Sequence, residues 1–402
     1  METADLQPVW NDASYVQRLS QHERMRRLLA LHGIDYDPNL TRTRTPDSKG
    51  VWSRPYDKLM LKVLVSDMRV LRIEPIRSLG DTGSPQSHAF LQRIGRYAVR
   101  VVYATGLDQA EVIIRCDSRR QATVLRIRAT AHSVRPEQQA EDASFLLGMD
   151  PEFVIVNAQG KLVPASRFLD FDGSVGYDTA TIKGRPDLHP LAELRPAPSA
   201  EPDELVRNLR KTMWQAAARI TDPSLRWVAG GMPVRGMPLG GHIHFSGVPL
   251  RASLVRALDN YMAMPLLLLE HPSGIDRRRK YGQLGDIRLK AYGGFEYRTL
   301  PSLLNSPTLT KGALAMAKLI ALHSSRLTKR YLDQERYASA YYQGDKQALL
   351  EPVERVWQEL VRLPGYGDYA AELSRVKQWI DNRRVWEETV DFRVYWRIPP
   401  YH

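Results

Sequence analysis

The chain has 402 residues, of which 43% are hydrophobic and 25% are charged, and its formal net charge is +12. This length and hydrophobic content suffice for a folded protein with two domains, or with one large domain and appendages. The single cysteine, Cys116, excludes an internal disulfide and a cysteine-based zinc site, and its place in an apolar strand pattern predicts a buried structural thiol.

The first third of the chain predicts a helix followed by a small β domain. Residues 14–32 carry apolar residues at helical spacing and end at Gly33, whereas residues 35–53 are polar and typical of a loop. Apolar and alternating runs then predict strands at 58–65, 68–74, 97–103, 110–115 and 123–128. We therefore expect an antiparallel β domain over residues 1–140, with its boundary in the Gln- and Glu-rich segment 133–143.

The rest of the chain predicts a mixed region and then a helical one. A long strand is expected at 145–156, with a turn at 157–160 and a return strand. Further strands are expected at 193–195, 227–229 and 242–245, with a last pair within 286–300, and helices at 204–220 and at 254–269, the latter kinked at Pro265. The final hundred residues predict helices at 307–332, 346–363 and 369–385.

Targeting signals and membrane segments are not expected. The N-terminal sequence lacks a charged segment followed by an apolar one, which excludes a signal peptide by pattern. The longest apolar run, residues 262–269, is too short for a bilayer and contains Pro265. The sequence therefore predicts a cytoplasmic protein with no membrane partner.

The positive charge raises the question of nucleic-acid binding. The arginines are dispersed among acidic and apolar residues, so nucleic acid is not expected as the primary partner. The one dense run, Arg277 to Lys280, lies just before Tyr281. Two interpretations stay open for this run: a solvated loop, or a loop that faces phosphate over an active site.

Three pairs of polar residues lie two positions apart inside strand-like sequence, so each pair projects from one face of its strand. They are Asp150 with Glu152, His242 with His244, and Glu296 with Arg298. On one sheet these pairs would converge, and acids and imidazoles beside arginines suit divalent cations bound next to a polyanion such as a nucleotide triphosphate. The alternative for each pair is an ordinary ion pair or a structural histidine.

Five motifs in order resemble a known family. They are Gly-Met-Asp-Pro-Glu-Phe at 148–153, Glu-Leu-Arg-Pro at 193–196, Gly-Gly-His-Ile-His-Phe-Ser at 240–246, Tyr-Gly-Gln-Leu-Gly-Asp-Ile-Arg at 281–288 and Phe-Glu-Tyr-Arg at 295–298. This set resembles the phage-type carboxylate-amine ligases of type 2, in the superfamily of glutamine synthetase and glutamate-cysteine ligase. The resemblance covers residues 144–305. It implies an α+β fold, a glutamine synthetase-like curved antiparallel sheet backed by helices, within a ligase domain of residues 141–402.

The resemblance also implies roles for single residues. The implied metal ligands are Asp150, Glu152, Glu193, His242 and Glu296. The implied catalytic and nucleotide contacts are His244, Arg288 and Arg298, with Arg195 as a further nucleotide contact. Relatives often have one more acid between the first two motifs, and Asp178 and Asp187 both stay open for it.

The activity implied by the resemblance is ATP-dependent formation of an amide or peptide bond through an acyl phosphate, with Mg²⁺ or Mn²⁺. The partners would be a small carboxylate and an amine, such as amino acids or peptides. A homo-oligomer stays open, because relatives often complete the site across a subunit interface. Alternatives are a guanidino kinase of the same fold, a metal hydrolase that uses His242 and His244, and a non-catalytic basic scaffold that binds nucleic acid. No P-loop, Rossmann glycine run or GxSxG motif occurs in the sequence.

Overall fold

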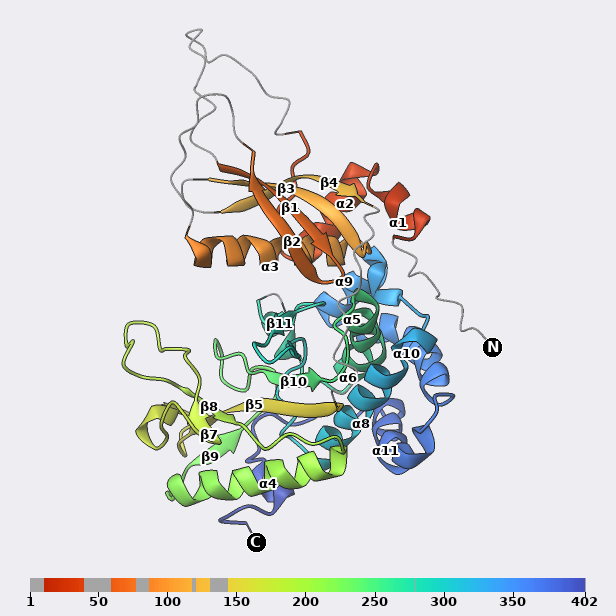
Figure 1. Cartoon of the computed structure of the whole chain (residues 1–402). Helices are drawn as coiled ribbons and strands as arrows, with labels where there is room; N and C mark the ends of the chain where they lie inside the picture. The colour runs from red at the N-terminus through yellow and green to blue at the C-terminus, as the bar shows by residue number, and fades with distance from the viewer. Residues whose placement is uncertain are drawn as a thin grey trace. The chain divides into compact units, whose positions relative to one another are not determined.

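The computed structural model describes residues 11–39, 59–76, 87–117, 121–130, 144–278 and 280–401. The chain divides into two compact units, residues 1–137 and 138–402 (Figure 1). Within the described ranges, no helix is both long enough and apolar enough to cross a bilayer.

The first unit contains an antiparallel sheet with the strand order β2-β1-β3-β4. Its strands are β1 (Leu59–Ser66), β2 (Arg69–Pro75), β3 (Gln109–Cys116) and β4 (Ala122–Ala129). Its helices are α1 (Ala13–Arg18), α2 (His22–Leu31) and α3 (His88–Ala104). Alternate residues of β1, including Leu61, Val63 and Val65, are buried, and α3 packs against β1, β2 and β3. The free Cys116 is buried at the end of β3, as its apolar context predicted.

Two local predictions in this unit were wrong. Residues 97–103 form part of α3 and are not a strand, because the buried residues Ile94, Ala98 and Val101 recur at helical spacing and Ser87 caps the helix by accepting from the backbone N–H of Phe90. The single helix expected over 14–32 is divided into α1 and α2. Most of the loop expected at 35–53 lies outside the described residues, and so does the whole boundary segment expected at 133–143.

The second unit is built on an antiparallel sheet with the strand order β11-β12-β10-β5-β8-β7, and β6 and β9 also pair with β5. Its strands are β5 (Leu146–Val156), β6 (Leu162–Val163), β7 (Val175–Tyr177), β8 (Leu191–Leu194), β9 (Arg226–Val228), β10 (Gly241–Ser246), β11 (Ile287–Leu289) and β12 (Phe295–Tyr297). The predicted strands of residues 145–300 therefore occur in the structure. The architecture is mixed, with helices and antiparallel sheets.

Helices pack beside this sheet and fill the C-terminal part of the unit. They are α4 (Pro202–Arg219), α5 (Ala252–Leu258), α6 (Met264–Leu267), α7 (Gly274–Arg278), α8 (Pro307–His323), α9 (Glu335–Gln343), α10 (Lys346–Leu360), α11 (Ala370–Asp381) and α12 (Arg393–Trp396). Helix α4 packs against β5, β7 and β8, and α8 packs against α4, α5 and α11 (Figure 1). The helix expected over 307–332 ends at His323, and α9 was not predicted. A π-helical segment, Asp259–Ala263, joins α5 to α6 just before Pro265.

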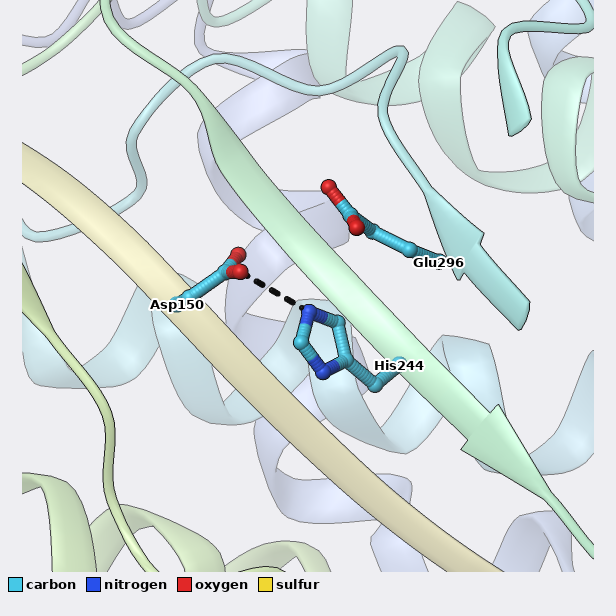
Figure 2. Close-up of side chains that lie close together, drawn as sticks. All are labelled: Asp150, His244 and Glu296. Carbon is cyan, nitrogen blue, oxygen red and sulfur yellow. Dashed lines mark hydrogen bonds and ion pairs between the residues drawn. The ribbon is translucent and has the colours of Figure 1, made fainter. Parts of the chain in front are cut away.

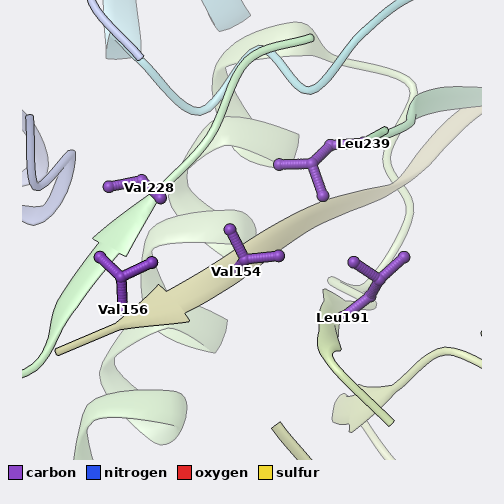
Figure 3. Close-up of a cluster of buried hydrophobic side chains, with 5 residues drawn as sticks. All are labelled: Val154, Val156, Leu191, Val228 and Leu239. Carbon is purple, nitrogen blue, oxygen red and sulfur yellow. The ribbon is translucent and has the colours of Figure 1, made fainter. Parts of the chain in front are cut away.

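Strand β5 is the centre of the unit and is buried along nearly its whole length. On one face, its last residues Val154 and Val156 join Leu191, Val228 and Leu239 in a buried apolar cluster (Figure 3). The residues that precede them on this same face are Asp150 and Glu152, because side chains alternate along a strand. The apolar cluster therefore anchors the strand whose earlier half carries the acids.

Candidate active site

The strand register brings the predicted polar residues onto one face of the second unit's sheet. His242 on β10 lies opposite Asp150 on β5, and His244 lies opposite Glu296 on β12. Two further pairs extend this row: Glu152 opposite Glu193, and Glu296 opposite Arg288. Residues that are far apart in the sequence thus form one continuous polar surface, as the two-residue spacing predicted.

Asp150 lies at the centre of this surface and is held by both histidines. Its Oδ1 lies 3.0 Å from Nδ1 of His242, and its Oδ2 lies 3.0 Å from Nε2 of His244. Burial alone would raise the pKa of Asp150, but the hydrogen bonds from the histidines outweigh it and hold this pKa well below its usual range. Burial disfavours the charged imidazole of His242, yet the hydrogen bond to Asp150 raises its pKa. Asp150 is therefore an ionised carboxylate in a buried site.

Glu296 is fully buried and is surrounded by positive charge. Its Oε2 lies 2.6 Å from Nζ of Lys290 and 3.5 Å from Nη1 of Arg288, and its Oε1 forms an ion pair with Arg298. Nδ1 of His242 also lies 3.2 Å from Oε1. Burial acts to raise the pKa of Glu296, but the charges of His242 and Arg298 and the hydrogen bond from Lys290 lower it overall. This carboxylate therefore links the histidines to the basic side of the site.

Asp150, His244 and Glu296 form a candidate metal centre (Figure 2). One donor atom from each of these residues lies within 4.8 Å of the other two. Carboxylate oxygens with one imidazole nitrogen suit Mn²⁺ or Mg²⁺, so the donor set fits the divalent ion implied by the motifs. The grouping contains His244, to which the sequence assigned phosphate, and not His242, to which it assigned the metal. Both histidines lie 3.0 Å from Asp150, so this distance does not distinguish a metal ligand from a phosphate contact. The roles of His242 and His244 remain predictions.

Glu152 and Glu193 form a second acidic pair beside this centre. Glu152 is buried and its Oε2 accepts a hydrogen bond of 2.7 Å from the backbone N–H of Gly240, while burial raises its pKa. Burial and repulsion by Asp150 raise the pKa of Glu193 to about 7. Two neighbouring carboxylates whose charges are disfavoured gain most from a bound cation, so this pair suits a second ion or a cationic group.

Arg195 supports the acidic side of the site through backbone contacts. Its guanidinium pairs with Glu193 and donates hydrogen bonds to the carbonyl oxygens of Phe171, at 3.0 Å, and Gly173, at 3.2 Å. These bonds tie the loop before β7 to the strand that carries Glu193. The predicted contact of Arg195 with a nucleotide remains a prediction.

The two candidates for the additional acid lie in different environments. Asp178 follows β7 and lines the same cleft as Asp150 and Glu193. Asp187 is exposed and forms an ion pair with Arg185 at 3.0 Å, and it is not among the residues that line the cleft. The geometry therefore favours Asp178.

Both interpretations of the basic run at 277–280, a solvated loop and a loop that faces phosphate, are wrong for Arg277 and Arg278. Arg277 and Arg278 lie in α7, and each is only 2% exposed. Arg277 donates to backbone carbonyls, and Arg278 pairs with the buried Glu270. Neither is a solvated loop residue or a free cation over the site, because tertiary packing has buried both guanidinium groups. Arg279 lies outside the described residues.

The structure adds Lys290 to the site, which the sequence analysis did not single out. Lys290 contacts Glu296 and lines the cleft. Its signal was available, because it follows Arg288 by two residues and therefore projects from the same face. By contrast, the role of the Gly240 N–H depends on a tertiary contact that no local pattern predicts.

Part of this polar sheet face lines a cleft of about 630 Å³ within the second unit. Its acidic side contains Asp178 and Glu193, and its basic side contains Arg288 and Lys290. Asp150 and His244 lie between them, since β5 and β10 are central in the sheet. This volume falls in the range of small-molecule sites.

The family model described as phage phiEco32-like COOH-NH2 ligase type 2 matches residues 147–398. The chain belongs to this family. The match covers all the residues of the cleft except Leu146, so the second unit is the ligase region of a carboxylate-amine ligase family member. The family resemblance that the motifs indicated is thereby confirmed, and the match also extends over most of the helical C-terminal region.

No significant match occurs among curated proteins. Among solved structures, the chain is similar to a bifunctional glutathione synthetase from Pasteurella multocida, with 14% identity and a TM-score of 0.32. That similarity covers 63% of this chain and 51% of the synthetase, so the chain spans about half of that protein.

Proposed function

We propose that this chain is an ATP-dependent ligase with a glutamine synthetase-like site, which joins a small carboxylate to an amine through an acyl phosphate. The observation that carries the proposal is the row of acids, histidines and basic residues on one sheet face in a member of a carboxylate-amine ligase family. Four residues of this row line a single cleft: Asp150, Glu193, His244 and Arg288. Carboxylate activation by ATP needs a site for metal and phosphate and does not need a side-chain nucleophile.

The distribution of charge across the cleft supports an orientation for the substrates. Arg288 and Lys290, on the side of β11, provide cations for the phosphates of ATP. Asp178 and Glu193, on the side of β7 and β8, provide acids that attract an ammonium group. We place the nucleotide on the basic side and the amine on the acidic side, so that the carboxylate to be activated lies between them.

The metal would be held by Asp150, Glu296 and His244, with Glu152 and Glu193 available for a second ion. When bound, a divalent ion supplies charge neutralisation for the phosphates of the nucleotide. His242 orients Asp150 through its hydrogen bond, and Gly240 orients Glu152. These contacts hold the two carboxylates in defined orientations.

The proposed reaction has two steps. A carboxylate oxygen of the first substrate attacks the γ-phosphorus of ATP, the bond to ADP breaks, and an acyl phosphate forms. The amine nitrogen then attacks the acyl carbon, inorganic phosphate leaves, and the nitrogen loses a proton. Arg298 would contact the transferred phosphoryl group, because a guanidinium pairs with two phosphate oxygens and stays charged.

The experiment is a screen of pooled amino acids for ATP-dependent phosphate release, with mass spectrometry of the condensed products. A ligase releases ADP and inorganic phosphate in step with amide formation. With hydroxylamine as the nucleophile, it converts the carboxylate substrate to a hydroxamate, because hydroxylamine traps the acyl phosphate.

A guanidino kinase gives a different result: ADP, a stable phosphorylated product and no free phosphate. That outcome, with no hydroxamate from any carboxylate tested, would contradict the ligase proposal and leave the metal and nucleotide assignments intact. Absence of metal-dependent ATP binding to the purified chain would contradict those assignments as well.

A further inference from the structure

Arg277 lies on α7 and binds the backbone of two segments that carry site residues. Its Nε donates to the carbonyl of Leu239 at 2.6 Å, its Nη1 to that of Thr299 at 2.9 Å, and its Nη2 to that of Leu300 at 2.6 Å. The side chain is only 2% exposed. A guanidinium is suited to this task because its donors have fixed directions in one plane.

The first of these contacts acts on Glu152 through one peptide group. The carbonyl of Leu239 and the N–H of Gly240 belong to the same planar unit. Arg277 binds the oxygen of that unit, and Glu152 accepts from its N–H at 2.7 Å. The Glu152 backbone N–H also donates to the Gly240 carbonyl at 2.9 Å. The orientation of the Glu152 carboxylate is therefore fixed by a peptide plane that Arg277 holds from the opposite side.

The other two contacts act on the segment that follows Arg298. Thr299 is its direct neighbour, and the carbonyl of Leu300 accepts both from Arg277 and from the backbone N–H of Gly241 at 3.1 Å. The same guanidinium thus ties the segment just before β10 to the segment just after β12.

Glycines make these close contacts possible. A Cβ at Gly282, which has a φ of +93°, would overlap with Nη1 of Arg277, and a Cβ at Gly241 would overlap with the carbonyl oxygen of Pro301. Larger residues at these positions would displace the arginine or separate the strands. The surroundings of Arg277 are therefore shaped to hold its guanidinium in one place.

We infer that Arg277 is a positioning residue of the active site, which sets the orientation of Glu152 and its separation from Arg298. The inference rests on the proposed function, in which Glu152 serves a metal and Arg298 a phosphoryl group. If Arg277 only stabilised the fold, its replacement would lower the melting temperature and leave the affinity of the folded site for metal unchanged. As a positioning residue, Arg277 supports that affinity, so its replacement weakens metal binding.

The test is Mn²⁺ binding to the full chain by titration calorimetry, at a temperature where circular dichroism shows each variant to be folded. Arg277→Lys keeps the charge but cannot reach three carbonyls, so we expect its Mn²⁺ affinity to fall roughly tenfold or more, the effect typical of lost outer-shell contacts. Arg278→Lys is the matched control. Arg278 lies in the same helix as Arg277 and is also 2% exposed, but it contacts Glu270 and the ring of Tyr341.

A second pair of variants moves the guanidinium without removing it. Gly282→Ala places a methyl group against Nη1 of Arg277 and against the Thr299 carbonyl oxygen that this nitrogen binds, whereas Gly184→Ala has a similar φ of +81° and nothing within 4 Å. We expect weaker Mn²⁺ binding in Gly282→Ala and near wild-type binding in Gly184→Ala. The pair separates the displacement of Arg277 from the cost of a positive φ.

Wild-type affinity in Arg277→Lys or in Gly282→Ala would overturn the inference, as would an equal loss in Arg278→Lys. Failure of both Arg277→Lys and Gly282→Ala to fold, with both controls folded, would assign Arg277 a purely structural role. If the wild-type chain binds no Mn²⁺, the metal assignment of the proposed function fails together with the inference. If the wild-type chain binds Mn²⁺ and the variants bind it with the same affinity, only the inference about Arg277 fails, and the metal assignment stands.

Discussion

Replacing Glu296 with glutamine tests whether this carboxylate is the charge that holds the basic side of the site together. The substitution keeps the shape of the side chain and removes one negative charge from a fully buried position. Arg298 and Lys290, whose side chains are 19% and 23% exposed, would lose their ion-pair partner. The side chain of Arg288 is 56% exposed, so the loss of its ion pair with Glu296 adds little to the cost in stability.

The expected cost follows from this burial. Breaking a buried ion pair by removing one partner costs about 3–5 kcal/mol. For a unit of this size, that corresponds to a fall in the melting temperature of roughly 6–20 °C. Metal binding should also weaken. At a Mn²⁺ concentration that stabilises the wild-type chain by about 2.7 kcal/mol, a tenfold or greater loss of affinity leaves about 1.4 kcal/mol or less.

The assay is thermal unfolding with and without Mn²⁺, followed by circular dichroism, with Glu354→Gln as the control. Glu354 pairs with Lys377 at 3.0 Å on the surface, with 51% of its side chain exposed, so we expect a loss of about 0–1 kcal/mol and an unchanged Mn²⁺ effect. A melting temperature and a Mn²⁺ shift equal to wild type in Glu296→Gln would refute the assignment of Glu296 to both the ion pairs and the metal centre.

The pH dependence of the free energy of unfolding tests the same contribution of the Glu296 charge. The pKa of Glu296 is lowered in the folded chain, so its ionised form contributes stability above the ordinary carboxyl range, and this contribution is lost as the pH falls through the folded pKa. The stability difference between wild type and Glu296→Gln should therefore be largest near neutral pH and should narrow below about pH 4. A difference that grows on acidification would contradict the charge argument.

Two further predictions concern residues around the cleft. Arg298→Lys should keep the fold and most of the ATP affinity but lose turnover by roughly a hundredfold or more, because lysine cannot contact two phosphate oxygens; wild-type turnover in this variant would make Arg298 a structural partner of Glu296. Asp178→Asn should weaken metal or amine binding, and Asp187→Asn should leave both unchanged, because Asp178 lines the cleft and Asp187 pairs with Arg185 outside it. The measurement is calorimetric titration of both variants with Mn²⁺ and with amine. A larger loss of affinity in Asp187→Asn than in Asp178→Asn would reverse this assignment.

The spacing of the motifs was sufficient to predict the polar face of the sheet. A two-residue repeat fixes that Asp150 and Glu152 share a face, and the same holds for His242 and His244, because alternation is a local property of any strand. The ordered motifs were also sufficient to indicate the ligase family, which the family match confirms. The roles of the individual site residues stay predictions, since they depend on ligands.

A short window of sequence did not distinguish helix from strand at residues 97–103. Their β-branched residues fit a strand, and the helical spacing appears only over the whole of α3, whose apolar face is buried against β1, β2 and β3. The alternation of a strand likewise does not tell which residue of a distant strand will lie opposite. The grouping of His244 with Asp150 and Glu296 therefore came from the tertiary register.

The basic run at 277–280 illustrates the same limit for charge. Adjacent cations are usually solvated, so their sequence indicated a loop. In the folded chain Arg277 and Arg278 are buried, because backbone carbonyls of distant segments and the carboxylate of Glu270 compensate their charges. The sequence by itself determined which strand faces carry charge. The tertiary structure alone decided which charges meet, since burial and compensation depend on partners that the chain brings together only by folding.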